Sequence, residues 1–279
     1  MKDEAFSLYK RCFPEDSDAV TDVVFSERLF GAERREKRVD GELVSVLWLV
    51  EKKLYFCGKI IPVYHVVGLC TAPERRNKGY AKALLSETLS SLSGIPIVTL
   101  YPFDHAFYEK LGFAAVSFDD DPPSDAEKTS VDADLLVDLY RDFCQGLDYY
   151  YIRNKEDFSF YKAVNAPFGQ NYALLDGGKS GFCSPDEYIP RSYFDKREKK
   201  KGVMARIADL SAVDEYFPLP CRLAAIDPLV PANNRVVIGA EFPAPALRLP
   251  IGDLVSALFG RNENLPFFGR KIGHLADRY

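Results

Sequence analysis

Residues 64–92 place the strongest constraint on what this chain can fold into. An apolar run over 64–70 predicts a buried strand, and Pro73 ends it because proline cannot donate to a sheet ladder. Leucines at helical spacing over 79–92 predict an amphipathic helix. A basic turn with the sequence RRNKGYA, residues 75–81, joins the two. The sequence therefore predicts a strand, a tight turn and a helix in direct succession.

This basic turn has the chemistry of an anion-binding site. The first N–H groups of a helix have no partner within the helix, and the helix dipole adds partial positive charge at that end. Arg75, Arg76 and Lys78 add full charges, and Gly79 lets a ligand approach the backbone closely. The combination favours a pyrophosphate group as the ligand. An ordinary strand–helix connection with a solvated basic surface is the alternative.

Two motifs resemble those of the GCN5-related N-acetyltransferases (GNAT). Arg76-x-x-Gly79-x-Ala81 after a strand resembles the family's acetyl-CoA signature, usually written Gln/Arg-x-x-Gly-x-Gly/Ala. The block FYEKLGF, residues 107–113, resembles the family's late helix-to-strand element. The predicted order of elements up to residue 118 matches as well. It begins with two helices over 3–12 and 16–30 and an antiparallel meander of strands over 33–39, 43–50 and 53–57, with a hairpin turn at residues 40–41. The cofactor strand and helix follow, then a strand over 97–100, a helix over 104–111 and a strand over 113–118. The resemblance implies an α+β fold with a mixed, mostly antiparallel sheet flanked by helices.

The resemblance also implies acetyl-CoA as co-substrate and a set of residues that hold it. The predicted cofactor-binding residues are Leu69, Cys70, Thr71, Arg76, Asn77, Lys78, Gly79, Tyr80, Ala81, Phe103 and Asp104. Cys70 lacks a recognisable histidine partner and fits a buried structural thiol better than a nucleophile. Asp104 is equally well explained as a helix N-cap.

Tyr108 occupies the family position of the general acid that protonates the departing thiolate. A phenol with a pKa near 10 is protonated at neutral pH, which suits that role. The alternative is a ring that only packs the last helix against the sheet. In the Eis-like acetyltransferases the general base is the terminal carboxylate, which implies this role for Tyr279. A frayed tail is the alternative, with Asp22 or Glu27 as the base.

The rest of the chain resembles the Eis-like acetyltransferases, named for the mycobacterial enhanced intracellular survival protein. An acidic, proline-rich stretch, DDDPPSD at 119–125, predicts a domain boundary rather than a surface loop. Residues 204–210, 227–234 and 254–260 resemble strings of that family's sterol-carrier-like domain. The resemblance implies a GNAT domain over 1–118, a shortened and degenerate GNAT-like domain over 119–201, and a sterol-carrier-like α/β domain over 202–279.

Composition narrows the classes of function. A chain of 279 residues that is 47% hydrophobic can bury one large core or a few smaller ones. The net charge of −5 argues against nucleic-acid binding. Six cysteines without a C-x-x-C pair and three histidines without ligand spacing predict neither a disulfide framework nor a metal site. No apolar run approaches a bilayer span and no signal peptide is evident, so we expect a cytoplasmic protein without a membrane partner.

Together these features predict an enzyme that transfers an acetyl group from acetyl-CoA to an amine of a small molecule or peptide. The family mode implies direct transfer in a ternary complex, without a metal. A non-catalytic module that binds acyl-CoA or a lipid is the alternative. The resemblance leaves homo-oligomer formation open.

Overall fold

The structure is a computed structural model, and it describes residues 3–119, 131–168, 172–184, 187–192, 200–217, 219–239, 245–265, 268–271 and 273–275. The α-helices are α1 (Glu4–Cys12), α2 (Asp18–Val23), α3 (Tyr80–Ser91), α4 (His105–Glu109), α5 (Ala133–Phe143), α6 (Lys155–Asn165), α7 (Leu210–Tyr216) and α8 (Ile251–Leu258). Shorter helical turns are the π-helical η1 (Val24–Arg28) and the 3₁₀ turns η2 (Pro73–Arg75), η3 (Ala166–Phe168), η4 (Asp176–Gly178) and η6 (Pro231–Arg235). The strands are β1 (Glu33–Val39), β2 (Glu42–Phe56), β3 (Lys59–Thr71), β4 (Ile97–Leu100), β5 (Ala114–Ala115), β6 (Phe118–Asp119), β7 (Tyr149–Tyr151), β8 (Ala173–Leu175), β9 (Gly181–Cys183), β10 (Tyr188–Pro190), β11 (Lys200–Lys201), β12 (Met204–Ile207), β13 (Leu223–Ile226), β14 (Val237–Ile238), β15 (Leu247–Pro250) and β16 (Gly273–His274).

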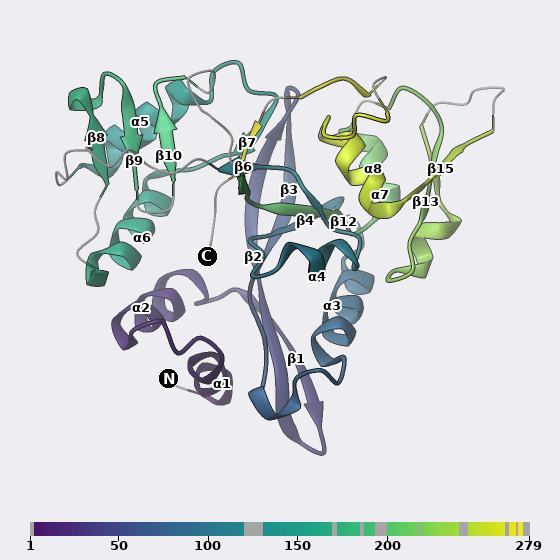
Figure 1. The fold of residues 1–279 in the computed structure, drawn as a ribbon, viewed down its shortest axis with the longest axis horizontal. Helices are drawn as coiled ribbons and strands as arrows, with labels where there is room; N and C mark the ends of the chain where they lie inside the picture. The colour runs from purple at the N-terminus through teal and green to yellow at the C-terminus, as the bar shows by residue number, and fades with distance from the viewer. Residues whose placement is uncertain are drawn as a thin grey trace.

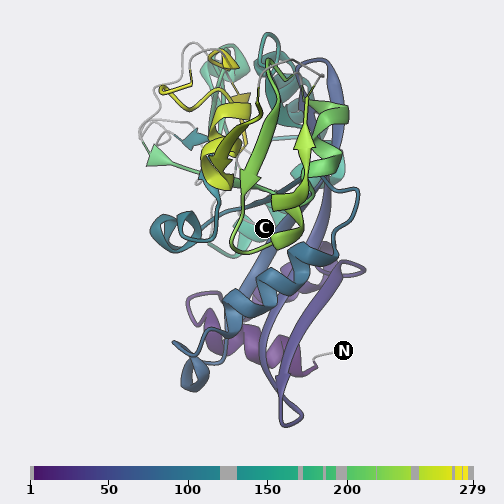
Figure 2. The same cartoon turned by 90° about the vertical axis from the view of Figure 1, so that its right-hand side faces the viewer.

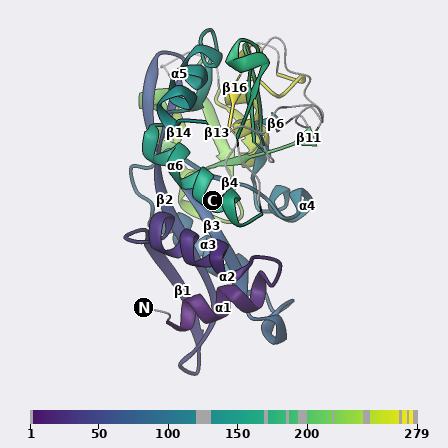
Figure 3. The same cartoon turned by 90° about the vertical axis from the view of Figure 1, so that its left-hand side faces the viewer.

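An eight-stranded sheet organises the fold, in the order β16-β7-β2-β3-β4-β12-β5 with β1 paired to β2. The long strands β2 and β3 form its spine (Figure 1). Alternate side chains of this spine point to opposite faces. Trp48 and Val67 pack with α1 and α2, whereas Leu47 and Val66 pack with α3. Figure 3 shows α1, α2 and α6 together on one side, and Figure 2 shows α3 running below the C-terminal elements.

Most predicted elements are confirmed, and the differences have local causes. The predicted pair of strands over 43–50 and 53–57 is one strand, β2, because the charged residues between them stay paired with β3. The predicted helix over 16–30 changes from α2 to the π-helical turn η1. The predicted strand over 113–118 is reduced to the two-residue strands β5 and β6. The fold class is confirmed as α+β with a mixed sheet.

The main sheet joins strands from all three predicted segments. β7 comes from the middle segment and pairs antiparallel with β2. β12 comes from the last segment and pairs antiparallel with both β4 and β5. Three smaller sheets of the described chain, β10-β9-β8, β14-β13-β15 and the two-stranded β11-β6, lie outside it. The division into three domains stays a prediction, while the sheet itself crosses both predicted boundaries.

A buried ion pair fastens β12 and β13 to the rest of the molecule. The Arg206 guanidinium lies 2.5 Å from the Asp227 carboxylate, and both side chains are fully buried. Arg206 also donates to the backbone carbonyls of Leu111 and Ile207, at 2.8 and 2.6 Å. Leu111 follows α4, so this pair holds the turn after α4 in place.

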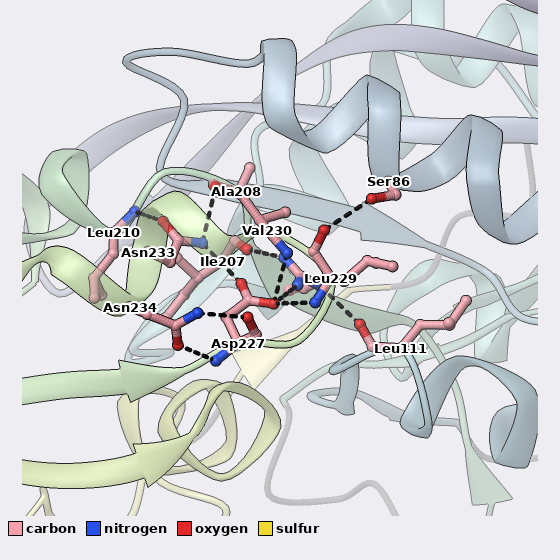
Figure 4. Close-up of polar contacts among 11 residues, drawn as sticks. Ser86, Leu111, Ile207, Ala208, Leu210, Asp227, Leu229, Val230, Asn233 and Asn234 are labelled. Atoms are coloured by element: carbon pink, nitrogen blue, oxygen red, sulfur yellow. Dashed lines mark hydrogen bonds and ion pairs between the residues drawn. The ribbon is translucent and has the colours of Figure 1, made fainter.

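Around Asp227 the polar atoms of the following loop converge (Figure 4). Asp227 Oδ1 accepts from the backbone N–H groups of Leu229 and Val230, both at 3.0 Å. Asp227 Oδ2 accepts from the Asn233 amide at 2.9 Å, and Ser86 on α3 donates to the Leu229 carbonyl at 2.8 Å. Two of the strings that resemble the sterol-carrier-like domain thus form one structural network.

Candidate functional site

A cleft of about 520 Å³ opens where β3 ends and α3 begins. All of the predicted cofactor-binding residues except Lys78 line it. The lining residues are Cys12, Phe13, Glu15, Leu69, Cys70, Thr71, Arg75, Arg76, Asn77, Gly79, Tyr80, Ala81, Lys82, Phe103, Asp104 and Phe107. Lys78 is exposed but does not line the cleft. Cys12 at the end of α1, Phe13 directly after it and Phe107 on α4 were not among the predicted cofactor-binding residues.

The N-terminus of α3 is open to this cleft. Its N-cap is Gly79, with φ +81°, and no side chain caps the first N–H groups. A Cβ at Gly79 would meet nothing within 4 Å, so the space before these donors is free. Asn77 also has a positive φ of 62°, which bends the turn toward the helix end. Donors, dipole and open space together suit an anionic group.

The basic side chains of this turn differ in whether a carboxylate pairs with them. Arg75 pairs with Glu42 at 2.5 Å. Arg76 donates through Nε to the Thr71 carbonyl at 3.4 Å, and among the described residues no carboxylate pairs with Arg76 or Lys78. These two exposed cations therefore keep their charge available at the cleft and its rim.

Strands β3 and β4 separate next to the cleft. Their parallel pairing ends at Val66 and Leu100, whereas β3 continues to Thr71. The backbone edge of β3 beyond Val66 consequently has no neighbouring strand on that side within the described chain. An extended ligand can pair with such an edge as an additional strand would. We call the point of separation the fork.

A β-bulge shapes β3 at the fork. The register shifts so that Val46 faces Cys70 and Trp48 faces Val67, which leaves one extra residue on β3. Gly68 lies in this bulge with φ +63°, and a Cβ there would approach the Trp48 and Tyr9 rings to 3.1 Å. Bulges of this kind redirect the backbone beside binding sites. A glycine inside an apolar strand pattern was the available sequence signal for it.

Tyr108 lies on α4 behind the wall of the cleft. It is only 3% exposed, and its ring contacts Phe107 and Phe113 at centroid distances of 5.0 and 5.6 Å. Phe103, which lines the cleft and is 75% exposed, lies 5.6 Å from the Tyr108 ring. Burial raises the pKa of the Tyr108 phenol, so the hydroxyl is protonated at neutral pH. Both the packing role and a donor role are compatible with this position.

Asp104 has the N-cap role that the sequence offered as one alternative. Its carboxylate accepts a hydrogen bond from the Ala106 backbone N–H at 2.9 Å and so caps α4. It also lines the cleft.

Two thiols meet at the cleft wall. The Cys12 thiol lies beside that of Cys70 and donates to the Thr71 carbonyl at 3.3 Å. The Cys70 thiol and then Arg76 lower the pKa of Cys12 to about 7, against the effect of burial. The contact with Cys12, followed by burial, raises the pKa of Cys70. A neutral, buried Cys70 is a poor nucleophile.

On the opposite face of the fork lies a buried polar cluster that the sequence did not predict. His65 belongs to the β3–β4 ladder and is fully buried. Its Nδ1 lies 3.0 Å from the Thr99 hydroxyl and 3.3 Å from the Tyr151 hydroxyl, and its Nε2 has no partner among the described residues. Burial, and then Lys52 and Arg28, lower the pKa of His65, so the imidazole is neutral.

Of the candidate bases predicted from the sequence, Asp22 and Glu27 do not line the cleft. Asp22 and Glu27 are exposed on α2 and η1. Tyr279 lies outside the described residues. Within the part of the chain that is described, no group of His, Cys, Asp and Glu side chains could hold a metal ion. No helix in that part is long and apolar enough to span a membrane.

The class of protein follows from this geometry and from the comparison with known families. Residues 2–116 match the family model described as an acetyltransferase (GNAT) domain. The N-terminal part of this chain is therefore a GNAT acetyltransferase domain, the domain of enzymes that transfer acyl groups. No curated protein matches the sequence.

Solved structures show the same fold over nearly the whole chain. A probable N-acyltransferase of unknown function from Enterococcus faecalis is 16% identical, with a TM-score of 0.70 over 99% of this chain and 96% of that one. A GCN5-related N-acetyltransferase from Kribbella flavida is 13% identical, with a TM-score of 0.67 over 99% and 97%. Eis1 from Mycobacterium abscessus is 14% identical, with a TM-score of 0.66 over 95% and 89%. The likeness shows a shared fold, and the sterol-carrier-like assignment of residues 202–279 stays a prediction.

Proposed function

We propose that this protein is an N-acetyltransferase that uses acetyl-CoA and transfers the acetyl group directly to an amine of a small molecule or peptide. The observation that carries the proposal is the uncapped N-terminus of α3 next to the fork between β3 and β4. One end of the cleft suits a pyrophosphate and the other offers a free strand edge to an extended arm. A ligand with both features in series fits the two together.

The residues around the cleft fit such a ligand. The backbone N–H groups at the start of α3 would bind the pyrophosphate, with Arg76 and Lys78 adding charge. The backbone of residues 69–71 would pair with the pantetheine arm, and Phe103 would cover it with an apolar ring. When bound, acetyl-CoA supplies an activated acetyl thioester.

Residues of the chain itself would donate and accept the protons. Tyr108 would hold a proton at its hydroxyl and give it to the departing sulfur, so that CoA leaves as the neutral thiol rather than as the thiolate. The acceptor amine must lose a proton before or as it attacks. We propose the terminal carboxylate of Tyr279 for that role, as the resemblance implies, and Asp22 or Glu27 if the terminus does not supply it.

The proposed pyrophosphate site at the N-terminus of α3 can be tested with a matched pair of glycines. Gly79 and Gly94 both have positive φ, 81° and 78°, and both face open space, but they lie at opposite ends of α3. Gly79→Asp places a carboxylate against the pyrophosphate, and like charges at close range cost several kcal/mol. We expect calorimetry to show loss of most CoA affinity in Gly79→Asp and none in Gly94→Asp. Equal CoA affinities in both variants would contradict the assignment of the pyrophosphate site to the N-terminus of α3.

Thiol release separates an enzyme from a module that only binds CoA. Purified protein is mixed with acetyl-CoA and a panel of amines, and free CoA thiol is measured against a control without amine. An amine-dependent increase supports the transferase. Tight CoA binding without any amine-dependent release would favour the binding module instead.

A further inference from the structure

The buried polar cluster at the fork contains donors for which the described part of the chain supplies no acceptor. Arg28, at the end of η1, has two buried nitrogens without a partner, Nε and Nη2. Tyr161 on α6 has a buried hydroxyl without a partner. Buried donors are nearly always paired in native proteins, so a group of unpaired ones needs an explanation. A ligand that accepts hydrogen bonds is the simplest one.

The unpaired nitrogens of Arg28 form one edge of its guanidinium. The Nη1 atom of Arg28 lies 3.2 Å from the Asp157 carboxylate, and the Arg28 side chain is 12% exposed. Nε and Nη2 project in parallel from the opposite edge, the arrangement that binds two oxygens of one carboxylate. The Phe160 and Tyr161 rings lie 4.3 and 5.5 Å from the guanidinium carbon and hold it in place.

Charge in the cluster is close to balance. Arg28 pairs with Asp157 at 3.2 Å, and Arg153 pairs with Glu187 at 2.8 Å. Burial, and then Arg28, lower the pKa of Lys52 in the same cluster well below its ordinary value. An additional carboxylate at the open edge of the Arg28 guanidinium would oppose this shift in the pKa of Lys52 as well as pair with Arg28.

The cluster borders both a cavity and the fork. A cavity of about 520 Å³ is lined by Lys52, Tyr151, Arg153 and Asp157, among others. Arg28 and Tyr161 do not line it themselves, and Asp157, the ion-pair partner of Arg28, connects them to it. The Tyr151 hydroxyl donates to Thr99 at 2.7 Å, and Thr99 pairs with His65 in the β3–β4 ladder. His65 precedes Leu69 by four residues, about 13 Å along the strand. A molecule in this place can reach the fork from the face opposite α3.

We propose that the free edge of Arg28, assisted by the Tyr161 hydroxyl, binds a carboxylate beside the fork. The inference rests on the proposed function in placing the acceptor on this face, and it makes the acceptor an amine that also carries a carboxylate. The chain's own terminal carboxylate is a second source of the same group.

The test compares amines that differ only in a carboxylate. Binding of L-phenylalanine and phenethylamine, and of L-lysine and cadaverine, is measured by calorimetry with CoA present. We expect the carboxylated member of at least one pair to bind about tenfold tighter or more, since charge-assisted pairs are the strong ones. Arg28→Lys keeps the charge beside Asp157 but loses the two-nitrogen edge, so it should abolish the preference. Tyr161→Phe, which removes only the unpaired hydroxyl, should reduce it.

Arg35→Gln is the matched control, because Arg35 on β1 also has a buried nitrogen without a partner. It should leave the preference unchanged. If the chain's own terminal carboxylate occupies the site, the wild type should show no preference for the carboxylated amine. Four residues added after Tyr279 should then lower the melting temperature of the wild type. The same addition should leave the melting temperature of Arg28→Lys unchanged. An absent preference without this coupling, or a preference that survives in Arg28→Lys, would overturn the proposal. Binding is measured without turnover, so a failure of acetyl transfer is distinguished from a failure of this site.

Discussion

Replacing Asp227 by asparagine should destabilise the protein strongly. The substitution keeps the shape of the side chain but removes the charge opposite Arg206, whose guanidinium is fully buried. One carboxylate oxygen now accepts from Leu229 and Val230, and the other accepts from Asn233. The asparagine NH₂ group must face one of these sets of donors, in either orientation.

The expected loss follows from the burial of the pair. Removing one partner of a buried ion pair typically costs about 3–5 kcal/mol, because the remaining charge is left uncompensated. At roughly 2–4 °C per kcal/mol for chains of this size, the melting temperature should fall by about 10 °C. Arg206 also holds the Leu111 carbonyl, so the turn after α4 should loosen with it.

Thermal unfolding and urea titration measure the loss. Asp253→Asn is the matched control, since Asp253 is exposed in the first turn of α8. A surface charge near a helix N-terminus contributes less than about 1 kcal/mol. The double variant Arg206→Met with Asp227→Leu should recover part of the stability, because apolar replacement of a buried ion pair is often neutral or favourable.

The reasoning is refuted if Asp227→Asn loses no more stability than Asp253→Asn. It is also refuted if the double variant is less stable than Asp227→Asn, since the loss would then not come from the unpaired charge.

Three further predictions concern single residues. Tyr108→Phe should keep CoA affinity and lower kcat by roughly 10²–10⁴-fold, the usual effect of a positioned proton donor, and an undiminished kcat would exclude the role. Iodoacetamide should modify Cys12 before Cys57, because the Cys70 thiol and Arg76 lower the pKa of Cys12 to about 7, whereas partial burial raises the pKa of Cys57. CoA should slow the modification of Cys12. Mass mapping that finds Cys57 modified first would contradict this prediction. Burial raises the pKa of Glu187, but its ion pair with Arg153 and hydrogen bond with His274 prevail and lower it from 4.5 to about 2. Glu187 should therefore contribute stability above pH 4.5 that is lost as the pH falls toward about 2; unfolding free energies of Glu187→Gln should lack this part of the slope, and an identical slope would disprove it.

The sequence by itself determined the elements whose causes are local. The N-cap at Asp104, the hairpin turn at residues 40–41 and the strand, turn and helix around Gly79 each depend on residues within a few positions of one another. The backbone conformation of a turn and the open donors of a helix N-terminus are set by neighbouring residues. For this reason the basic turn and the open helix N-terminus at Gly79 could be predicted from the residues themselves. The resemblance to the GNAT family supplied the other predicted lining residues, namely Leu69, Cys70, Thr71, Phe103 and Asp104.

Only the tertiary structure decided which distant segments meet. β12 enters the sheet between β4 and β5, and Arg28 meets Asp157 across 129 positions of the chain. Such contacts are selected by packing of the whole molecule, and no local pattern of sequence specifies them. The buried cluster at the fork is of this kind, because its members come from η1, β2, β3, β7 and α6. Arg28 and Tyr161 have no distinguishing feature in the sequence, and their donors are left unpaired only when the other members are packed around them.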